Sequence, residues 1–148
     1  MSVVGTATLN ELIEITRDGL RFYDAAGLQV QDPILLSLFK RKSETRAQLI
    51  EDLSALVTVQ GDLASSGGTT LGALRQTYAD LLAAMSSNAE TTYVNQLEAA
   101  EDRLLHAFED ARKATQIPLI AAALDRYLPK VRQMHDEMKQ LKLARKAA

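Results

Sequence analysis

Hydrophobic side chains recur every three or four residues along most of the chain, which is the spacing of one face of an α-helix. A capping-box pair, Thr8 and Glu11, precedes the first apolar stripe and predicts a helix over about 9–26. An Asp-Pro pair at 32–33 predicts the start of a second helix, which continues to about residue 59. Runs of alternating β-branched and aromatic residues are missing, so we expect an all-α chain.

The second half of the chain repeats this pattern after a glycine-rich connection over 61–70. Apolar periodicity predicts a short helix and then two long ones, over about 71–85, 89–115 and 117 to the C-terminal end. Pro129 lies inside the last of them, where it removes one backbone hydrogen bond. The apolar stripe continues in phase beyond this proline, so we expect a kink and not a break.

The order of these elements predicts a topology. Two long helices with a tight turn are followed by a long connection that carries a short helix, and then by two more long helices with a tight turn. One long crossover between the second and third long helices is typical of a ferritin-like four-helix bundle. We expect a single domain over 1–148, with flexible ends at about 1–7 and 144–148.

Composition narrows the function classes. The 148 residues are 47% hydrophobic and 24% charged with a net charge of −2, which is typical of a globular protein and offers no basic field for nucleic acid. No segment is apolar for eighteen residues and the start lacks a secretory pattern, so we expect no membrane span. Cysteine is absent, which excludes thiolate chemistry and favours a reducing compartment, so we expect a cytoplasmic protein.

Polar residues on the inward stripes are the candidates for chemistry, because buried polar groups need partners. The two carboxylates on the third long helix, Glu98 and Glu101, are the only acidic residues that the periodicity places inside. The predicted buried polar layer consists of Thr16, Tyr23, Lys42, Arg46, Glu98, Glu101, Tyr127 and His135.

Ferritin-like di-iron proteins place a Glu on each of two helices and a Glu-x-x-His pair on each of the other two. Here the second helix offers cations, and the residue three before His135 is Arg132. We therefore predict no cofactor, no metal site and no catalytic residue, and an ion-pair network of Glu98 and Glu101 with Arg46 and Lys42. Alternatives are a small polar pocket, a weak single-metal site with His135, or charges that reach solvent at the bundle edge.

Two surface features bear on partners. Residues 116–148 carry seven basic and three acidic groups, which fits either pairing with the acidic third long helix or docking on an acidic partner. Ile15 and Phe22 lie off the inner stripe of the first helix. Apolar groups on that flank predict either the seam of a homodimer or contact with the crossover helix.

Several segments together resemble an uncharacterised bacterial family of ferritin-like four-helix-bundle proteins. They are TLNELIEITRDGLRFYDAA, the DP pair with LFKRKSETRAQLIEDL after it, LGALRQTYADL, LEAAEDRLLHAFEDA and LPKVRQMHDEMKQLK. The resemblance covers nearly the whole chain and rests on the order and spacing of segments. It implies a ferritin-like bundle of unknown function, sometimes linked to stress, with no established active site to transfer.

The hypothesis from the sequence is a non-enzymatic binding or structural module. The first alternative is a metal-dependent oxidase or ferroxidase that uses Glu98, Glu101 and His135. A small-ligand carrier with the polar layer as its pocket is the second. An inward carboxylate on either of the first two helices would have favoured the oxidase, and we find none.

Overall fold

The computed structural model describes residues 3–86 and 88–147, and their side chains over 5–86 and 88–146. These residues form helices only and no strands, so the predicted all-α class is confirmed. The helices are α1 (Val3–Gly27), α2 (Pro33–Val59), α3 (Thr70–Met85), α4 (Ala89–Ala114) and α5 (Pro118–Ala147). Within the described residues, no helix is both long and apolar enough to cross a membrane.

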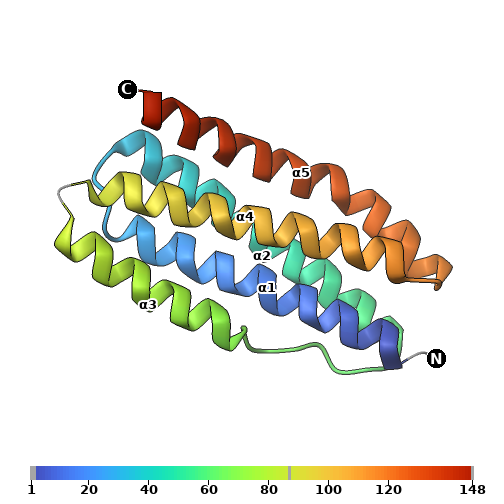
Figure 1. Ribbon diagram of the computed structural model, residues 1–148. Helices are drawn as coiled ribbons and strands as arrows, with labels where there is room; N and C mark the ends of the chain where they lie inside the picture. Colours follow the sequence, from blue (N-terminus) through green and yellow to red (C-terminus); the bar gives the residue numbers. More distant parts are fainter. Residues whose placement is uncertain (1–2, 87, 148) are drawn as a thin grey trace.

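The four long helices pack lengthwise into a bundle (Figure 1). α1 and α2 are antiparallel neighbours, as are α4 and α5, because a short turn joins each pair. The connection from α2 runs along the bundle before α3 begins, and α3 lies outside the four, against α1 and α4. α2 and α4 therefore point in the same direction, as a long crossover requires.

Side-chain caps explain where α2 and α3 begin. The Asp32 carboxylate accepts a hydrogen bond from the Ile34 amide at 2.9 Å, with Pro33 in the first turn, so α2 begins where the sequence predicts. Thr69 caps α3 in the same way, because its hydroxyl accepts from the Gly72 amide at 2.9 Å. Both caps satisfy amides that have no partner inside the helix.

The first helix begins earlier than the capping-box pattern predicts. α1 starts at Val3, so Thr8 lies inside a helix and does not cap one. Tertiary contact is the reason, since buried Thr6 donates to Asp62 in the following connection at 2.8 Å. Of the ends predicted to be flexible, 1–7 and 144–148, residues 3–7 and 144–147 are helical, and residues 1–2 and 148 lie outside the described residues.

The last helix runs through its proline. α5 is continuous from Pro118 to Ala147 with Pro129 inside it. The apolar stripe on both sides of the proline explains this, because Leu124 and Val131 are both buried in the same core cluster. Burial of that stripe outweighs the one backbone hydrogen bond that proline removes.

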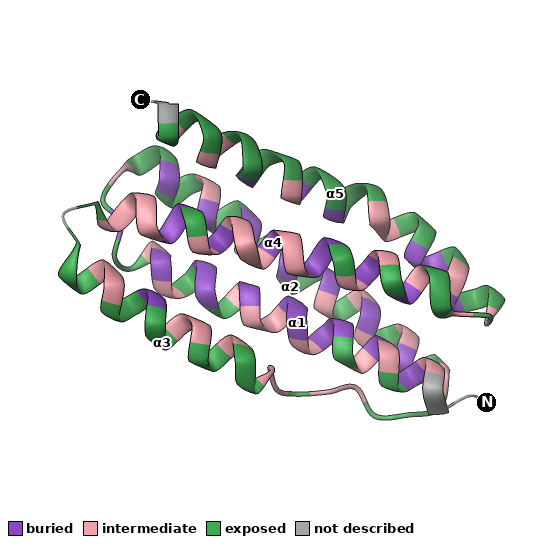
Figure 2. Cartoon of the chain, viewed as in Figure 1, coloured by how far each residue is buried: buried purple, intermediate pink, exposed green. Residues whose placement is uncertain are grey.

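Buried residues run the length of the bundle (Figure 2), and the apolar ones form two clusters. One cluster includes Leu9 of α1 and Phe108 of α4, and the other includes Phe39 of α2 and Leu97 of α4. On α1, α2 and α4 the stretch between the two clusters holds buried polar residues, which are Thr16, Lys42, Arg46 and Glu101.

Candidate functional site

The centre of the bundle holds an ion pair. Arg46 of α2 and Glu101 of α4 form a salt bridge through Nη2 and Oε1, with 0% and 1% of their side chains exposed. Nη1 of Arg46 donates to the Thr16 carbonyl at 3.1 Å and lies 3.5 Å from the Ile15 carbonyl, both on α1. The guanidinium thus ties three helices together, and the Glu101 carboxylate neutralises its charge.

A glycine makes room for this pair. Gly19 of α1 faces the guanidinium of Arg46 so closely that a Cβ at this position would overlap it. Thr16, one turn earlier, uses its hydroxyl to donate to the Leu12 carbonyl of its own helix at 2.6 Å. The α1 backbone, and not an α1 side chain, therefore supplies the acceptors for Arg46.

Tyr23 completes the layer on the α1 side. Its ring lies under the Arg46 guanidinium at 5.7 Å from the ring centroid, which is a cation–π distance. Burial, followed by the negative charge of Glu101, raises the pKa of the Tyr23 hydroxyl well above its usual value. This hydroxyl is therefore held protonated at any physiological pH.

Two predicted members of the layer pair elsewhere. Lys42 is buried one turn before Arg46, but its Nζ contacts Glu137 Oε1 of α5 at 2.7 Å and not an α4 carboxylate. Glu98 lies toward the edge of α4, where it meets Lys142 of α5 at 3.4 Å. The three acid–base pairs therefore use α5 as well as α4, which helical periodicity alone could not specify.

The last two predicted members lie outside the layer. The Tyr127 hydroxyl accepts from the neighbouring Arg126 at 3.3 Å, and the partly buried Tyr127 side chain packs against the core cluster that includes Leu9 and Phe108, not against Arg46. His135 lies at the edge between α4 and α5, with Nε2 3.2 Å from Asp102 and Nδ1 3.1 Å from Asp136. Asp102 also meets His106 at 3.4 Å, so one carboxylate bridges both histidines.

The described residues contain no group of three or more His, Asp or Glu side chains arranged to hold a metal ion. Inside the bundle, α4 contributes the single buried carboxylate, that of Glu101, and the inward residues of α5 include Met134 and Met138. A cation occupies the position between α1, α2 and α4. This donor set does not fit a di-iron centre, which needs several carboxylates and imidazoles facing one another.

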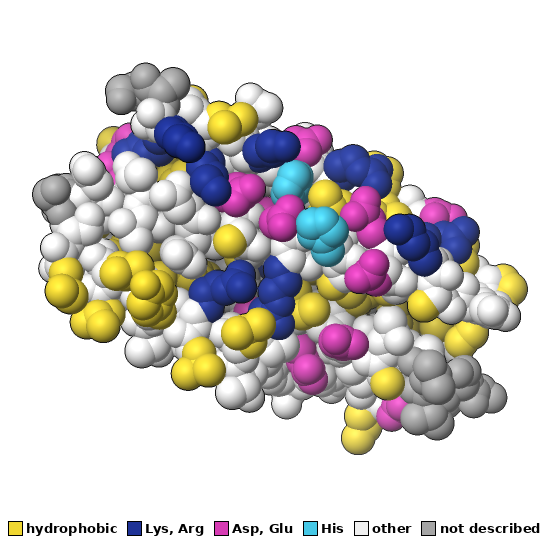
Figure 3. Space-filling model, viewed as in Figure 1, with side chains coloured by type: hydrophobic (Ala, Val, Ile, Leu, Met, Phe, Trp, Pro, Cys, Tyr) yellow, Lys and Arg dark blue, Asp and Glu magenta, His cyan; other side chains and the backbone are white. Residues whose placement is uncertain are grey.

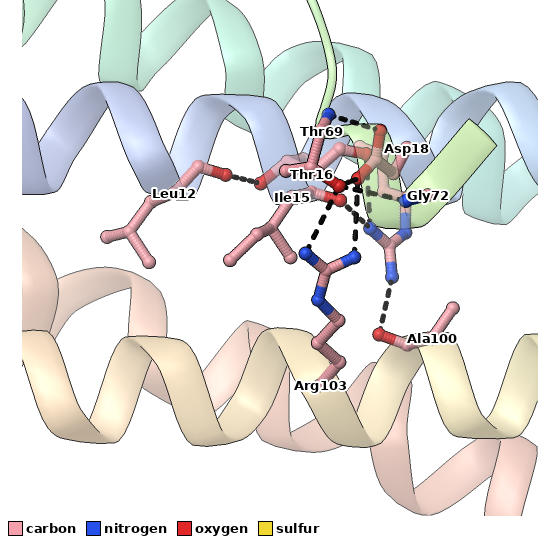
Figure 4. Close-up of polar contacts among 9 residues, drawn as sticks. Leu12, Ile15, Thr16, Asp18, Thr69, Gly72, Ala100 and Arg103 are labelled. Carbon is pink, nitrogen blue, oxygen red and sulfur yellow. Dashed lines mark hydrogen bonds and ion pairs between the residues drawn. The ribbon is translucent and has the colours of Figure 1, made fainter. Parts of the chain in front are cut away.

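A second polar cluster, which the sequence analysis missed, fixes α3 to the bundle (Figure 4). The Asp18 carboxylate accepts from the Thr69 amide at 2.9 Å and from the Thr69 hydroxyl, and Arg103 of α4 reaches Asp18 at 3.3 Å. Gly68 and Gly72 lie against Asp18, where a Cβ would overlap the carboxylate. The signals for this cluster in the sequence were Gly68 next to Thr69, and Gly72 three residues later, whose amide Thr69 caps.

The flank of α1 contacts this crossover helix. Ile15 and Phe22 are both buried, and with Gly72 and Arg75 of α3 they line a recess of about 10 Å³. That volume is space for one water at most. Of the two predicted roles for this flank, contact with the crossover helix is the one that the structure has.

An open groove lies between α2 and α5. It has a volume of about 510 Å³, with Lys42 and Leu49 on one wall and Tyr127 and Met134 on the other. Acidic and basic side chains alternate along it, including Glu44, Lys130 and Glu137. The basic C-terminal segment, in contrast, faces α4, where Arg145 meets Glu90 at 3.5 Å.

Comparison with known proteins identifies a family but no function. No curated protein and no solved structure shows significant similarity to this chain. The model of the domain of unknown function DUF2383 matches residues 5–114, which span α1 through α4 and so include Arg46, Glu101 and the α3 clamp. This chain therefore belongs to the DUF2383 family.

Proposed function

We propose that this protein is a ferritin-like bundle in which a buried ion pair replaces the metal centre, and that it acts as a non-enzymatic binding or structural module. The observation that carries the proposal is the Arg46–Glu101 pair, with both side chains fully buried at mid-bundle. The parallel course of α2 and α4 supports the ferritin-like assignment.

Charge is the physical reason that the site opposes a metal. A guanidinium keeps its charge in a protein interior, so any cation that bound Glu101 would lie beside Arg46 and be repelled. If a metal displaced Arg46, the hydrogen bonds from its guanidinium to the α1 carbonyls would also be lost. The layer is better suited to joining α1, α2 and α4 in one register than to binding a ligand.

The competing function is a metal-dependent oxidase or ferroxidase with unusual ligands. It would have to use Glu98 and Glu101 with His135. Glu98 pairs with Lys142, however, and His135 lies at the α4–α5 edge between two aspartates. A small-ligand carrier would have to use an open surface groove such as the one between α2 and α5, because the recess beside Gly19 has space for one water at most.

The experiment is metal analysis of protein purified without chelator, followed by anaerobic Fe(II) titration and exposure to oxygen. We expect no stoichiometric metal and an oxidation rate equal to that of Fe(II) in buffer. About two irons per chain with rapid oxidation would contradict the proposal.

A matched pair of variants makes this test sharper. Arg46→Gln removes the charge beside Glu101, whereas Lys42→Gln removes a cation one turn away on the same helix. If the guanidinium is what opposes cations, only Arg46→Gln should raise the affinity for a divalent metal such as Zn²⁺. Circular dichroism shows whether each variant keeps its helices.

A cytoplasmic location is part of the same proposal. Its support is the absence of cysteine from all 148 residues, which fits a reducing compartment. Fractionation of cells that produce the protein tests the location.

A further inference from the structure

The outer face of α3 carries a continuous apolar stripe. Its members follow one another at intervals of three and four residues, and between 51% and 78% of each is exposed. We name Leu71, Leu74, Tyr78, Leu81 and Met85 the α3 stripe. Figure 3 shows hydrophobic side chains gathered on the surface over this helix.

The opposite face of α3 is already used. Ala79 is fully buried against the bundle, and the Tyr93 hydroxyl of α4 donates to Asp80 at 3.2 Å. The clamp of Asp18, Thr69 and Arg103 fixes the N-terminal end of the helix. The α3 stripe is thus the face that stays exposed after α3 has packed on the bundle, and these contacts hold it in position.

The spacing defines what the stripe would pack against. Intervals of three, four, three and four residues are the a and d positions of a heptad, which interdigitate with the same pattern on another helix. The flanking positions that face solvent include Ala73, Thr77 and Ala84, which are small and allow close approach. We propose that this protein forms a two-fold symmetric homodimer in which the α3 stripes of two copies pack together.

The area agrees with a second copy as the occupant. Taking about 200 Å² for each large side chain, the exposed fractions amount to about 600 Å² of apolar surface. Two such stripes together amount to about 1,200 Å², which is the lower end of the roughly 1,200–2,000 Å² that specific interfaces bury in total. A single apolar patch of about 600 Å² is at the upper limit of what monomers expose.

Charge does not oppose self-association. Within the α3 stripe there is no ionised side chain, and the neighbouring residues on α3 include one cation, Arg75, and one anion, Asp80. Two copies of the same face therefore meet without like-charge repulsion along the seam. A face that recognised a different partner by charge would need an excess of one sign.

The test is the mass of the protein in solution by sedimentation equilibrium. We expect twice the 16.2 kDa of one chain for the native protein and 16.2 kDa for Leu74→Glu/Leu81→Glu. The matched control is Ile34→Glu/Val59→Glu, which makes the same changes at exposed apolar positions of α2, 77% and 72% exposed. This control should remain dimeric.

Cross-linking locates the seam independently of stability. The chain lacks cysteine, so Tyr78→Cys and Ala55→Cys each introduce a single thiol, on α3 and on the exposed side of α2. A short bis-maleimide should join two copies of Tyr78→Cys and not two of Ala55→Cys. A monomeric native protein at high concentration, or a stripe variant that remains dimeric with native helicity, would overturn the proposal, whatever the metal experiment shows.

Discussion

Two buried cations one helical turn apart on α2 have different surroundings. Arg46 is 0% exposed, pairs with a carboxylate that is equally buried, and also donates to α1 carbonyls. Lys42 is 3% exposed, but its partner Glu137 is 41% exposed at the rim of the α2–α5 groove. The guanidinium is held inside by several acceptors, whereas the ammonium group reaches along its stem toward water.

The comparison teaches that burial of a cation does not by itself indicate a critical ion pair. What matters is whether the partner can be solvated when the cation is removed. Glu101 has no access to water, so loss of Arg46 would leave a buried charge, whereas Glu137 would remain solvated. The two sites should therefore respond to mutation with very different magnitudes.

The largest effect is expected for Glu101→Ala. It leaves the Arg46 charge buried and unpaired, so the free energy of unfolding should fall by about 3–5 kcal/mol. Glu98→Ala is the matched control on the same helix and should cost about 1 kcal/mol or less, because Glu98 and Lys142 are both partly solvated. Urea denaturation measures both.

The double variant Arg46→Met/Glu101→Leu tests whether the pair is structural. It replaces both charges with apolar side chains, so much of the lost stability should return. A double variant that is less stable than Glu101→Ala would contradict this. It would show that the two charges stabilise the fold by more than neutralising each other.

The next largest loss of stability is expected for Gly19→Ala. Its Cβ would overlap the Arg46 guanidinium, so the pair must shift, at a cost of about 2–3 kcal/mol. Gly27→Ala, with open space around its added Cβ, should change stability by less than about 0.5 kcal/mol. In an Arg46→Met background the cost of Gly19→Ala should shrink, and equal costs in both backgrounds would contradict the steric explanation.

Alkaline pH should weaken the layer through Tyr23. Its pKa in the native state is raised by burial and by Glu101, so above the unfolded pKa, about 10, the native state binds the proton more tightly. The free energy of unfolding should then fall as pH rises beyond about 10. Tyr23→Phe should reduce this slope more than Tyr93→Phe, whose phenol has a pKa raised by burial and Asp80.

The smallest effect is expected for Lys42→Met. Methionine fills the space of the lysine stem, and Glu137 stays solvated, so stability should change by about 1 kcal/mol or less. Thermal denaturation of Lys42→Met beside Arg46→Met measures the contrast directly. Equal losses for the two variants would contradict the distinction drawn between the cations.

The sequence by itself determined most of the helices and most of the buried polar layer, although Glu98, Tyr127 and His135 lie at the edge of that layer or outside it. The Asp32-Pro33 start, the break at the glycine-rich connection and the stripe carrying Lys42 and Arg46 are readable because caps and periodicity are local properties. The same periodicity placed Glu101 on the inward face of α4. The start of α1 was not readable, since it depends on the contact of Thr6 with Asp62.

Only the tertiary structure decided which inward groups meet. Periodicity gives a residue's direction around its own helix but not its height relative to a neighbouring helix, so Glu98 and Glu101 looked equivalent. In the fold, Glu101 lies level with Arg46 and Gly19, while Glu98 lies level with Lys142. The clamp of Asp18 with Thr69 and Arg103 joins three segments far apart in sequence, and docking of α3 leaves its stripe facing outward.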